Sequence, residues 1–192
     1  MAGLPHWKNS QAAINYWEPV FQNQFLITIT PPAPASSGNS TALLVEHVVS
    51  VDGIPEILPA TVEQRYKFAQ RSFSASRPES TIADLTIKFT VNLNTTNDMY
   101  IYNALRAWAD LHYNPLNGRQ GLKRFQVGSI AIQMQNKAAE TFRTFNFNPC
   151  IMNGPLSAIK LDYTATELYE ITAKWRADSW NETRVGQITT AG

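Results

Sequence analysis

The sequence predicts a mainly β protein: an antiparallel β-sandwich or small barrel with one α-helix in the middle of the chain. Three observations support this fold class. Apolar and polar residues alternate in several separate stretches, which is the period of a strand with one buried face. Helical spacing is clear in one stretch, from Asp98 to His112. The chain has 192 residues, enough for a substantial core, so we expect 1–192 to form a single domain.

The N-terminal part begins with an aromatic-rich arm over residues 1–23, which has little periodicity. Alternation then predicts a strand at Phe25–Thr30. An exposed loop rich in proline and serine follows at residues 31–40. A second strand is predicted from Leu43 to Val51, and Asp52-Gly53 ends it.

Residues 54–80 interrupt this pattern with prolines and with a stretch of mixed charge around Tyr66 and Phe68. A segment of this length without regular structure is unusual inside a compact domain, and where it occurs it is usually functional. We therefore predict a projecting arm or hairpin that docks on a neighbouring subunit. The alternative is a mobile surface loop.

The next segment contains the clearest two-faced strand of the chain, followed by the helix. One face of the strand carries Leu85, Ile87, Phe89, Val91 and Leu93, and the other carries Asp84, Thr86, Lys88, Thr90 and Asn92. Thr96 or Asn97 is predicted to cap the helix from Asp98 to His112. Its buried stripe consists of Ile101, Leu105, Trp108 and Leu111, and Asn114-Pro115 ends it.

Further strands are predicted in the C-terminal part. Alternation predicts a strand at Ser129–Gln135, and Phe142, Phe145 and Phe147 predict another with a bulge near Arg143–Thr144. A short strand at 156–161 and a long final strand at 169–177 follow. Residues 183–192 are predicted to be a polar tail that needs a partner to become ordered.

The sequence contains no pattern typical of a catalytic, metal or cofactor site, so we predict no enzyme activity, metal or cofactor. Cys150 is the single cysteine and lies between Pro149 and Ile151, a setting typical of an inert core thiol. His6, His47 and His112 lack partners at metal-ligand spacing. Nucleophile-elbow and phosphate-binding glycine motifs are absent. Asp162 and Asp178 are interpreted as surface or capping residues.

The charge balance argues against a dedicated nucleic-acid-binding protein. The net charge is +1, and charged residues make up 16% of the chain, whereas about a quarter is usual. A surface this poor in charge and rich in amides and hydroxyls favours contact with other protein surfaces. No apolar run reaches the roughly 20 residues of a membrane span. The N-terminus lacks a signal-peptide pattern, and the lone cysteine suggests synthesis in a reducing compartment.

The five tryptophans divide into two groups. Trp108 and Trp175 fall on predicted buried faces and are assigned to the core. Trp7, Trp17 and Trp180 lie near the termini and are better candidates for subunit contacts, because aromatic residues dominate interface energies. A carbohydrate-binding β-sandwich that uses exposed tryptophans is a remote alternative.

The order of these features resembles a known assembly family. Asn97-Asp98 opens a helix that carries Ala107-Trp108, and Gly118, Gly121 and the strand Ser129–Gln135 follow. Leu161-Asp162-Tyr163 and a closing Ser179-Trp180-Asn181-Glu182 complete the series. This order resembles the tail tube proteins of contractile-tailed bacteriophages and, more distantly, the inner tubes of contractile injection and type VI secretion systems.

The resemblance implies a subunit that forms stacked hexameric rings around a lumen, inside a contractile sheath. Its partners would be other copies, the sheath, baseplate, tape-measure and neck or terminator proteins, with double-stranded DNA passing without specific binding. It would be assembled in the host bacterial cytoplasm and reside in the virion tail. Two alternatives are the tube of a bacterial injection system that carries protein cargo, and a ring that initiates or terminates the tube.

The resemblance also suggests which residues act in assembly. The expected lumen-facing residues are Asp84, Thr86, Lys88, Thr90, Asn92, Ser129, Gln133 and Gln135. The expected contacts between rings are Arg65, Tyr66, Lys67, Phe68 and Arg71, together with Trp7, Trp17 and Trp180. A neutral polar lumen suits DNA passage, because a strongly basic wall would retain the phosphate backbone.

Overall fold

The computed structural model describes residues 21–36, 41–56, 61–67, 69–74, 82–93, 99–114, 116–136, 139–158, 162–164 and 166–184. Its strands are β1 (Phe25–Thr30), β2 (Val48–Asp52), β3 (Thr61–Tyr66), β4 (Ala69–Ser74), β5 (Ala83–Thr90), β6 (Tyr113–Asn114), β7 (Arg119–Gln120), β8 (Gly128–Gln135), β9 (Thr141–Met152), β10 (Glu170–Ala177) and β11 (Trp180–Arg184). Its helices are α2 (Ala33–Ser36), α3 (Thr41–Glu46), α4 (Tyr100–Asp110) and α5 (Lys123–Gln126). The predicted mainly antiparallel β fold is confirmed.

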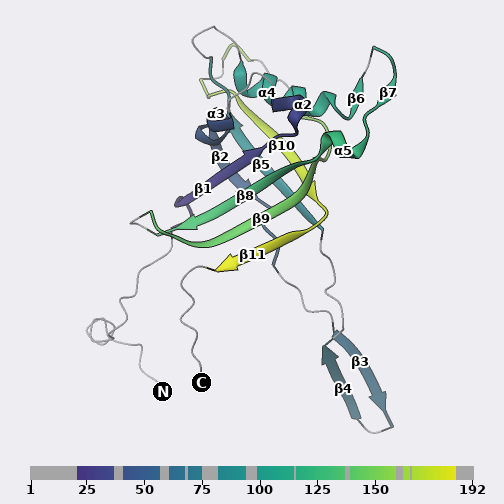
Figure 1. The fold of residues 1–192 in the computed structure, drawn as a ribbon. Helices are drawn as coiled ribbons and strands as arrows, with labels where there is room; N and C mark the ends of the chain where they lie inside the picture. The colour runs from purple at the N-terminus through teal and green to yellow at the C-terminus, as the bar shows by residue number, and fades with distance from the viewer. Residues whose placement is uncertain are drawn as a thin grey trace, which may run out of the picture.

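One large antiparallel sheet forms the body, in the order β1-β8-β9-β10-β5-β2, and β11 also pairs with β9. The long strand β9 joins two layers, because β11 pairs with its first half and β10 pairs with its last residues along the same edge. Figure 1 shows β1, β8, β9 and β11 in one layer and β2, β5 and β10 in the other. The sheet is not closed into a barrel, since β1 and β2 are its two ends.

The core lies between these layers and beneath α4. The register of β5 against β10 places Leu85, Ile87 and Phe89 beside Trp175, Ala173 and Ile171, all of them buried. Helix α4 buries Ile101, Ala104, Leu105 and Trp108 against the sheet. The alternation of β5, β8 and β10 and the helical stripe therefore produce the core that their periods predict.

Several predicted elements differ in the structure. The predicted strand Leu43–Val51 is wrong in its first half, where α3 runs from Thr41 to Glu46 before β2 begins. The loop at 31–40 contains the short helix α2. Apolar runs of this length do not distinguish helix from strand, and α3 owes its place to contact with β1.

Element ends also differ. Met99 takes the N-cap position of α4 without a side-chain hydrogen bond, and the expected caps Thr96 and Asn97 lie outside the described residues. Leu93 lies past the end of β5 and is exposed, not buried. One register shift in β9 falls between Thr141 and Arg143, slightly earlier than the expected bulge, and a second lies opposite Gly128 and Ile130. Residues 156–158 do not form a strand.

The C-terminal prediction missed a strand. Thr183 and Arg184, assigned to the polar tail, belong to β11, and residues 185–192 lie outside the described residues. The strand is short and has a largely exposed surface. It is ordered by pairing with β9, a long-range contact that local sequence does not reveal.

Candidate assembly surfaces

The predicted projecting segment contains an antiparallel hairpin made of β3 and β4, with pairs that run from Thr61–Ser74 to Tyr66–Ala69. Figure 1 shows the hairpin extending away from the large sheet. Every described side chain in it is exposed. A lone two-stranded hairpin is at best marginally stable in water, so this one is suited to gaining stability from a partner.

The two faces of the hairpin differ in chemistry. One face presents three apolar side chains, Val62, Tyr66 and Phe73, which are 57%, 50% and 48% exposed. On this face the Arg71 guanidinium lies 5.9 Å from the centre of the Tyr66 ring. The opposite face is polar, with Gln70 donating a hydrogen bond to Glu63. Exposed apolar side chains beside an arginine are typical of a protein-binding surface.

The residues expected to contact other rings fall into three places. Arg65, Tyr66, Lys67 and Arg71 lie in the hairpin or its turn, and Phe68, Trp7 and Trp17 lie outside the described residues. Trp180 begins β11, pairs with Phe147 and packs against the core, so it is only partly accessible. Their role in ring contact remains a prediction.

A polar face runs along β5 and β10. Asp84, Thr86, Lys88 and Thr90 face outward, opposite Arg176, Lys174, Thr172 and Glu170 of β10. Arg176 forms a bidentate ion pair with Asp84, with Nε and Nη2 at 2.8 and 2.9 Å from the carboxylate oxygens. That hydrogen-bonded guanidinium holds the pKa of Asp84 below its usual value. Lys88 pairs with Glu170. Most charges on this face are therefore neutralised by a neighbour.

The expected lumen residues do not all lie together. Ser129 and Gln133 point away from the core on β8, opposite Thr30 and Leu26 of β1. Because β8 belongs to one layer and β5 to the other (Figure 1), their outward faces lie on opposite sides of the sandwich. Gln135 is at the end of β8, and Asn92 lies beyond β5, where its amide contacts Nδ1 of His47 at 3.1 Å.

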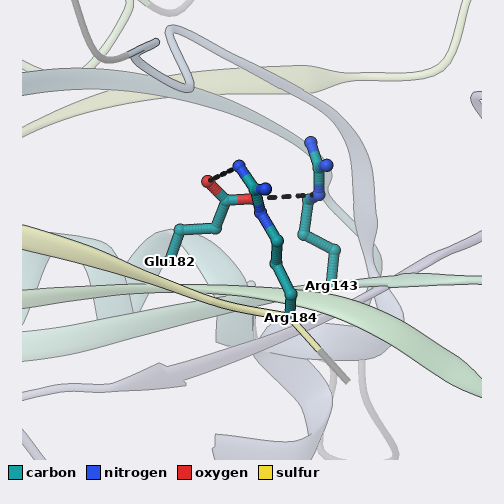
Figure 2. A network of polar contacts seen from close by, with 3 residues as sticks. All are labelled: Arg143, Glu182 and Arg184. Atoms are coloured by element: carbon teal, nitrogen blue, oxygen red, sulfur yellow. Dashed lines mark hydrogen bonds and ion pairs between the residues drawn. The ribbon is translucent and has the colours of Figure 1, made fainter. Parts of the chain in front are cut away.

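A charged cluster that the sequence did not indicate lies between β9 and β11 (Figure 2). Oε1 of Glu182 accepts a hydrogen bond from Nε of Arg184 at 3.0 Å and forms an ion pair with Nε of Arg143 at 2.9 Å. The Glu182 side chain is 13% exposed. The hydrogen bond from Arg184 and the nearby charge of Arg143 lower the pKa of this carboxyl. The available sequence signal was the spacing of two residues between Trp180, Glu182 and Arg184, which places all three side chains on one face of a strand.

The groups considered for chemistry have structural surroundings. Cys150 is buried, its Sγ lies 3.2 Å from the backbone oxygen of Phe147, and burial raises its pKa to about 12. Burial also lowers the pKa of His112. Within the described ranges, no three histidine, cysteine or acidic side chains gather in a way that would hold a metal ion. None of the described helices is long and apolar enough to cross a membrane.

Comparison with known proteins supports the fold. No family model matches this sequence, and no curated protein matches it. Among solved structures, the tube-terminating cap of the anti-feeding prophage aligns with a TM-score of 0.62 and 16% identity, over 90% of this chain and 95% of the other.

Two further solved structures belong to PVC, an extracellular contractile injection system. A chain of the extended sheath–tube complex aligns with a TM-score of 0.57 and 20% identity, over 92% of this chain and 97% of the other. The sheath/tube terminator aligns with a TM-score of 0.56 and 16% identity, over 89% and 99%. These alignments span nearly the whole of each chain. The chain therefore has the fold seen in tube and tube-terminating assemblies of contractile injection systems.

Proposed function

We propose that this chain is a structural ring subunit of the inner tube of a contractile tail, and that it forms stacked hexameric rings inside a sheath. The observation that carries the proposal is the exposed β3–β4 hairpin, which extends from a sheet whose ends are open. A protein that acted alone would leave these surfaces in solvent. A subunit that assembles with copies of itself covers them.

The open sheet supports ring formation. Among the described strands, β1 pairs with β8 alone and β2 pairs with β5 alone, so each has an unpaired edge. Unpaired edges promote aggregation unless they are covered. A ring of identical subunits covers such edges. Each contact joins two different surfaces of neighbouring copies, and the series of contacts closes into a ring when the rotation from one copy to the next divides a full turn evenly.

The lumen of the proposed tube conducts double-stranded DNA into the host at ejection, without specific binding. The wall is formed either by the β5–β10 face or by the β8–β1 face, since these lie on opposite sides of the sandwich. On the β5–β10 face the pairing of Lys88 with Glu170 and of Arg176 with Asp84 reduces attraction for phosphates. The same neutrality also suits protein cargo in a bacterial contractile injection system, which is the alternative cargo.

The other proposed partners follow from this role. They are the sheath around the tube, the baseplate below it, the tape-measure protein within it and the neck proteins above it. The assembled location is the virion tail, built in the cytoplasm of a bacterial host. Gene neighbours would separate the two systems: capsid and terminase genes beside this gene support a phage.

A tube-terminating ring is a second candidate function. The observation in its favour is that two of the structures with this fold are described as terminators. A terminator is present as one ring at the end of a tube, whereas a tube protein repeats. Ring number per particle, counted by mass measurement of purified particles, separates these two roles.

Electron microscopy of the concentrated full-length chain tests the proposal. The informative variant replaces Val62, Tyr66 and Phe73 with serine, and the matched control replaces Thr61, Ser72 and Ser74 on the opposite face of the hairpin with alanine. We expect rings or tubes from the natural chain and the control, and their loss from the serine variant. Small particles under all conditions, combined with glycan binding, would instead support a carbohydrate-binding sandwich.

A further inference from the structure

An apolar hollow of about 760 Å³ lies between the two ends of the large sheet. Its walls come from β1, β2, the end of α3 and the residues before β1. Its apolar lining includes Phe21, Leu26, Val45, Val49, Val51 and Ile54, and none of the described residues that line it is charged. Phe21, Leu26 and Val49 are each more than 40% exposed. Exposed apolar surface of this kind marks an interaction site.

The chain segment that supplies most of the lining of the hollow is acidic. Residues 21–56 contain Glu46, Asp52 and Glu56 and contain no lysine or arginine. All three acids are exposed. Glu46 directly follows the lining residue Val45, and Asp52 directly follows the lining residue Val51. Glu46 and Glu56, which lie within two residues of the lining residues Val45 and Ile54, are termed the acidic rim, whereas Asp52 follows Val51 in a strand, where successive side chains point to opposite faces.

The β3–β4 hairpin has the complementary composition. Residues 61–74 contain Arg65, Lys67 and Arg71 against the single acid Glu63. Arg71 lies on the same face as the exposed apolar side chains of the hairpin. The hollow and the hairpin thus both present apolar surface, and the charged residues near them are opposite in sign. Complementary charge of this kind favours one partner over others.

The hollow also contains an unused hydrogen-bond acceptor. Oε1 of Gln24 is buried in its wall and has no hydrogen-bond partner among the described residues. A buried acceptor without a donor is costly. Among the described strands, β1 and β2 each have one edge without a strand partner, which adds backbone N–H donors and C=O acceptors. An occupant that brings N–H donors, as arginine and glutamine side chains of the hairpin do, would satisfy the acceptors among these groups.

We propose that the apolar face of the β3–β4 hairpin of one copy seats in the hollow between β1 and β2 of a second copy. This inference rests on the proposed tube function and names the surface that receives the hairpin. Val62, Tyr66 and Phe73 enter the hollow, and Arg71, which shares their face of the hairpin, meets the acidic rim. The contact joins two different surfaces, so every copy offers one hairpin and one hollow, and the contact repeats through the assembly.

Cysteine cross-linking between two variants tests the contact directly. One variant carries Val49→Cys in the hollow and the other carries Tyr66→Cys on the hairpin; both positions are exposed. The two proteins are mixed at assembly concentration and treated with a short bismaleimide. We expect a cross-linked peptide that joins positions 49 and 66, found by mass spectrometry in the mixture and absent from either variant alone. The native Cys150 is buried and gives little background.

Charge reversal provides the second arm. Glu46→Lys combined with Glu56→Lys should lower the yield of the cross-link about tenfold or more, because like charges then meet at the rim. Adding Arg71→Glu, on the apolar face of the hairpin partner, should restore part of the lost yield. Glu167→Lys, at an exposed acid that is neither in the lining of the hollow nor in the segment 21–56, is the control and should leave the yield unchanged.

The outcomes for the hollow and for the tube are separable when the same mixtures are imaged. Rings or tubes without a 49–66 cross-link overturn the docking inference and leave the proposed function in place. A cross-link without rings or tubes supports the docking and contradicts the tube function. Absence of both counts against both, and a cross-link that ignores charge reversal contradicts the acidic rim as the recognition element.

Discussion

Trp108 of α4 and Trp175 of β10 meet edge to face in the core, with ring centroids 5.8 Å apart and planes at 60°. Phe89 approaches Trp175 from β5 in a similar way, at 6.1 Å. Aromatic pairs in this arrangement stabilise a core beyond the area that they bury. The helix is thus attached to the layer that carries the polar β5–β10 face.

Trp108 should be among the most sensitive positions for stability. Its indole Nε1 donates a hydrogen bond to the backbone oxygen of Gln126 at 2.9 Å. We expect Trp108→Ala to lower the free energy of unfolding by about 3–5 kcal/mol, and Trp108→Phe by about 1–3 kcal/mol, because the buried carbonyl loses its donor. Urea denaturation measures both values. A Trp180→Phe control, at a partly exposed site, should change little.

Gly128 should not tolerate a side chain. A Cβ at this position would lie 2.4 Å from the backbone oxygen of Thr30 and 2.7 Å from the Trp108 ring. We expect Gly128→Ala to lower the free energy of unfolding by about 1–3 kcal/mol through overpacking. Ser129→Ala on the outward face of the same strand is the control. Equal stability of both variants in thermal unfolding would show that the helix and β1 are not packed this closely.

The Arg143–Glu182–Arg184 cluster should make stability depend on acid pH. The pKa of Glu182 is lower in the folded chain than its usual value, so the unfolded chain binds the proton more readily. The stabilising contribution is therefore complete above the usual carboxyl pKa and is lost as pH falls through the lowered pKa. We expect Glu182→Gln to lower Tm at pH 7 and to have a progressively smaller effect as the pH falls below the usual carboxyl pKa. A Tm difference that stays constant across this acid titration would contradict the ionic role.

Cys150 should be unreactive while the chain is folded. Its pKa of about 12 leaves almost no thiolate at neutral pH, and the side chain is buried. We expect no labelling by iodoacetamide at pH 8 within the time that labels a surface cysteine such as Val49→Cys, and full labelling in urea. Rapid labelling of the native chain would show that the β9 segment opens readily.

The sequence alone determined the elements whose pattern is local. Alternation in β5, β8 and β10 and the helical stripe of Ile101, Leu105 and Trp108 specify both the secondary structure and its buried face, because each period admits one geometry. The core position of Trp175 follows from the alternation of β10, and the apolar neighbours of Cys150 predicted its burial. Short apolar runs such as that of α3 were ambiguous, since they fit helix and strand alike.

Tertiary structure alone decided how these elements combine. It ordered Thr183 and Arg184 as part of β11 by pairing them with β9, and it formed the ion-paired cluster around Glu182. It also placed the outward residues of β5 and β8 on opposite sides of the sandwich and left the sheet open between β1 and β2. Strand order and sheet closure depend on contacts between residues far apart in the chain. Alternation with a period of two shows which side chains of a strand are buried, but it does not show which strand lies beside it.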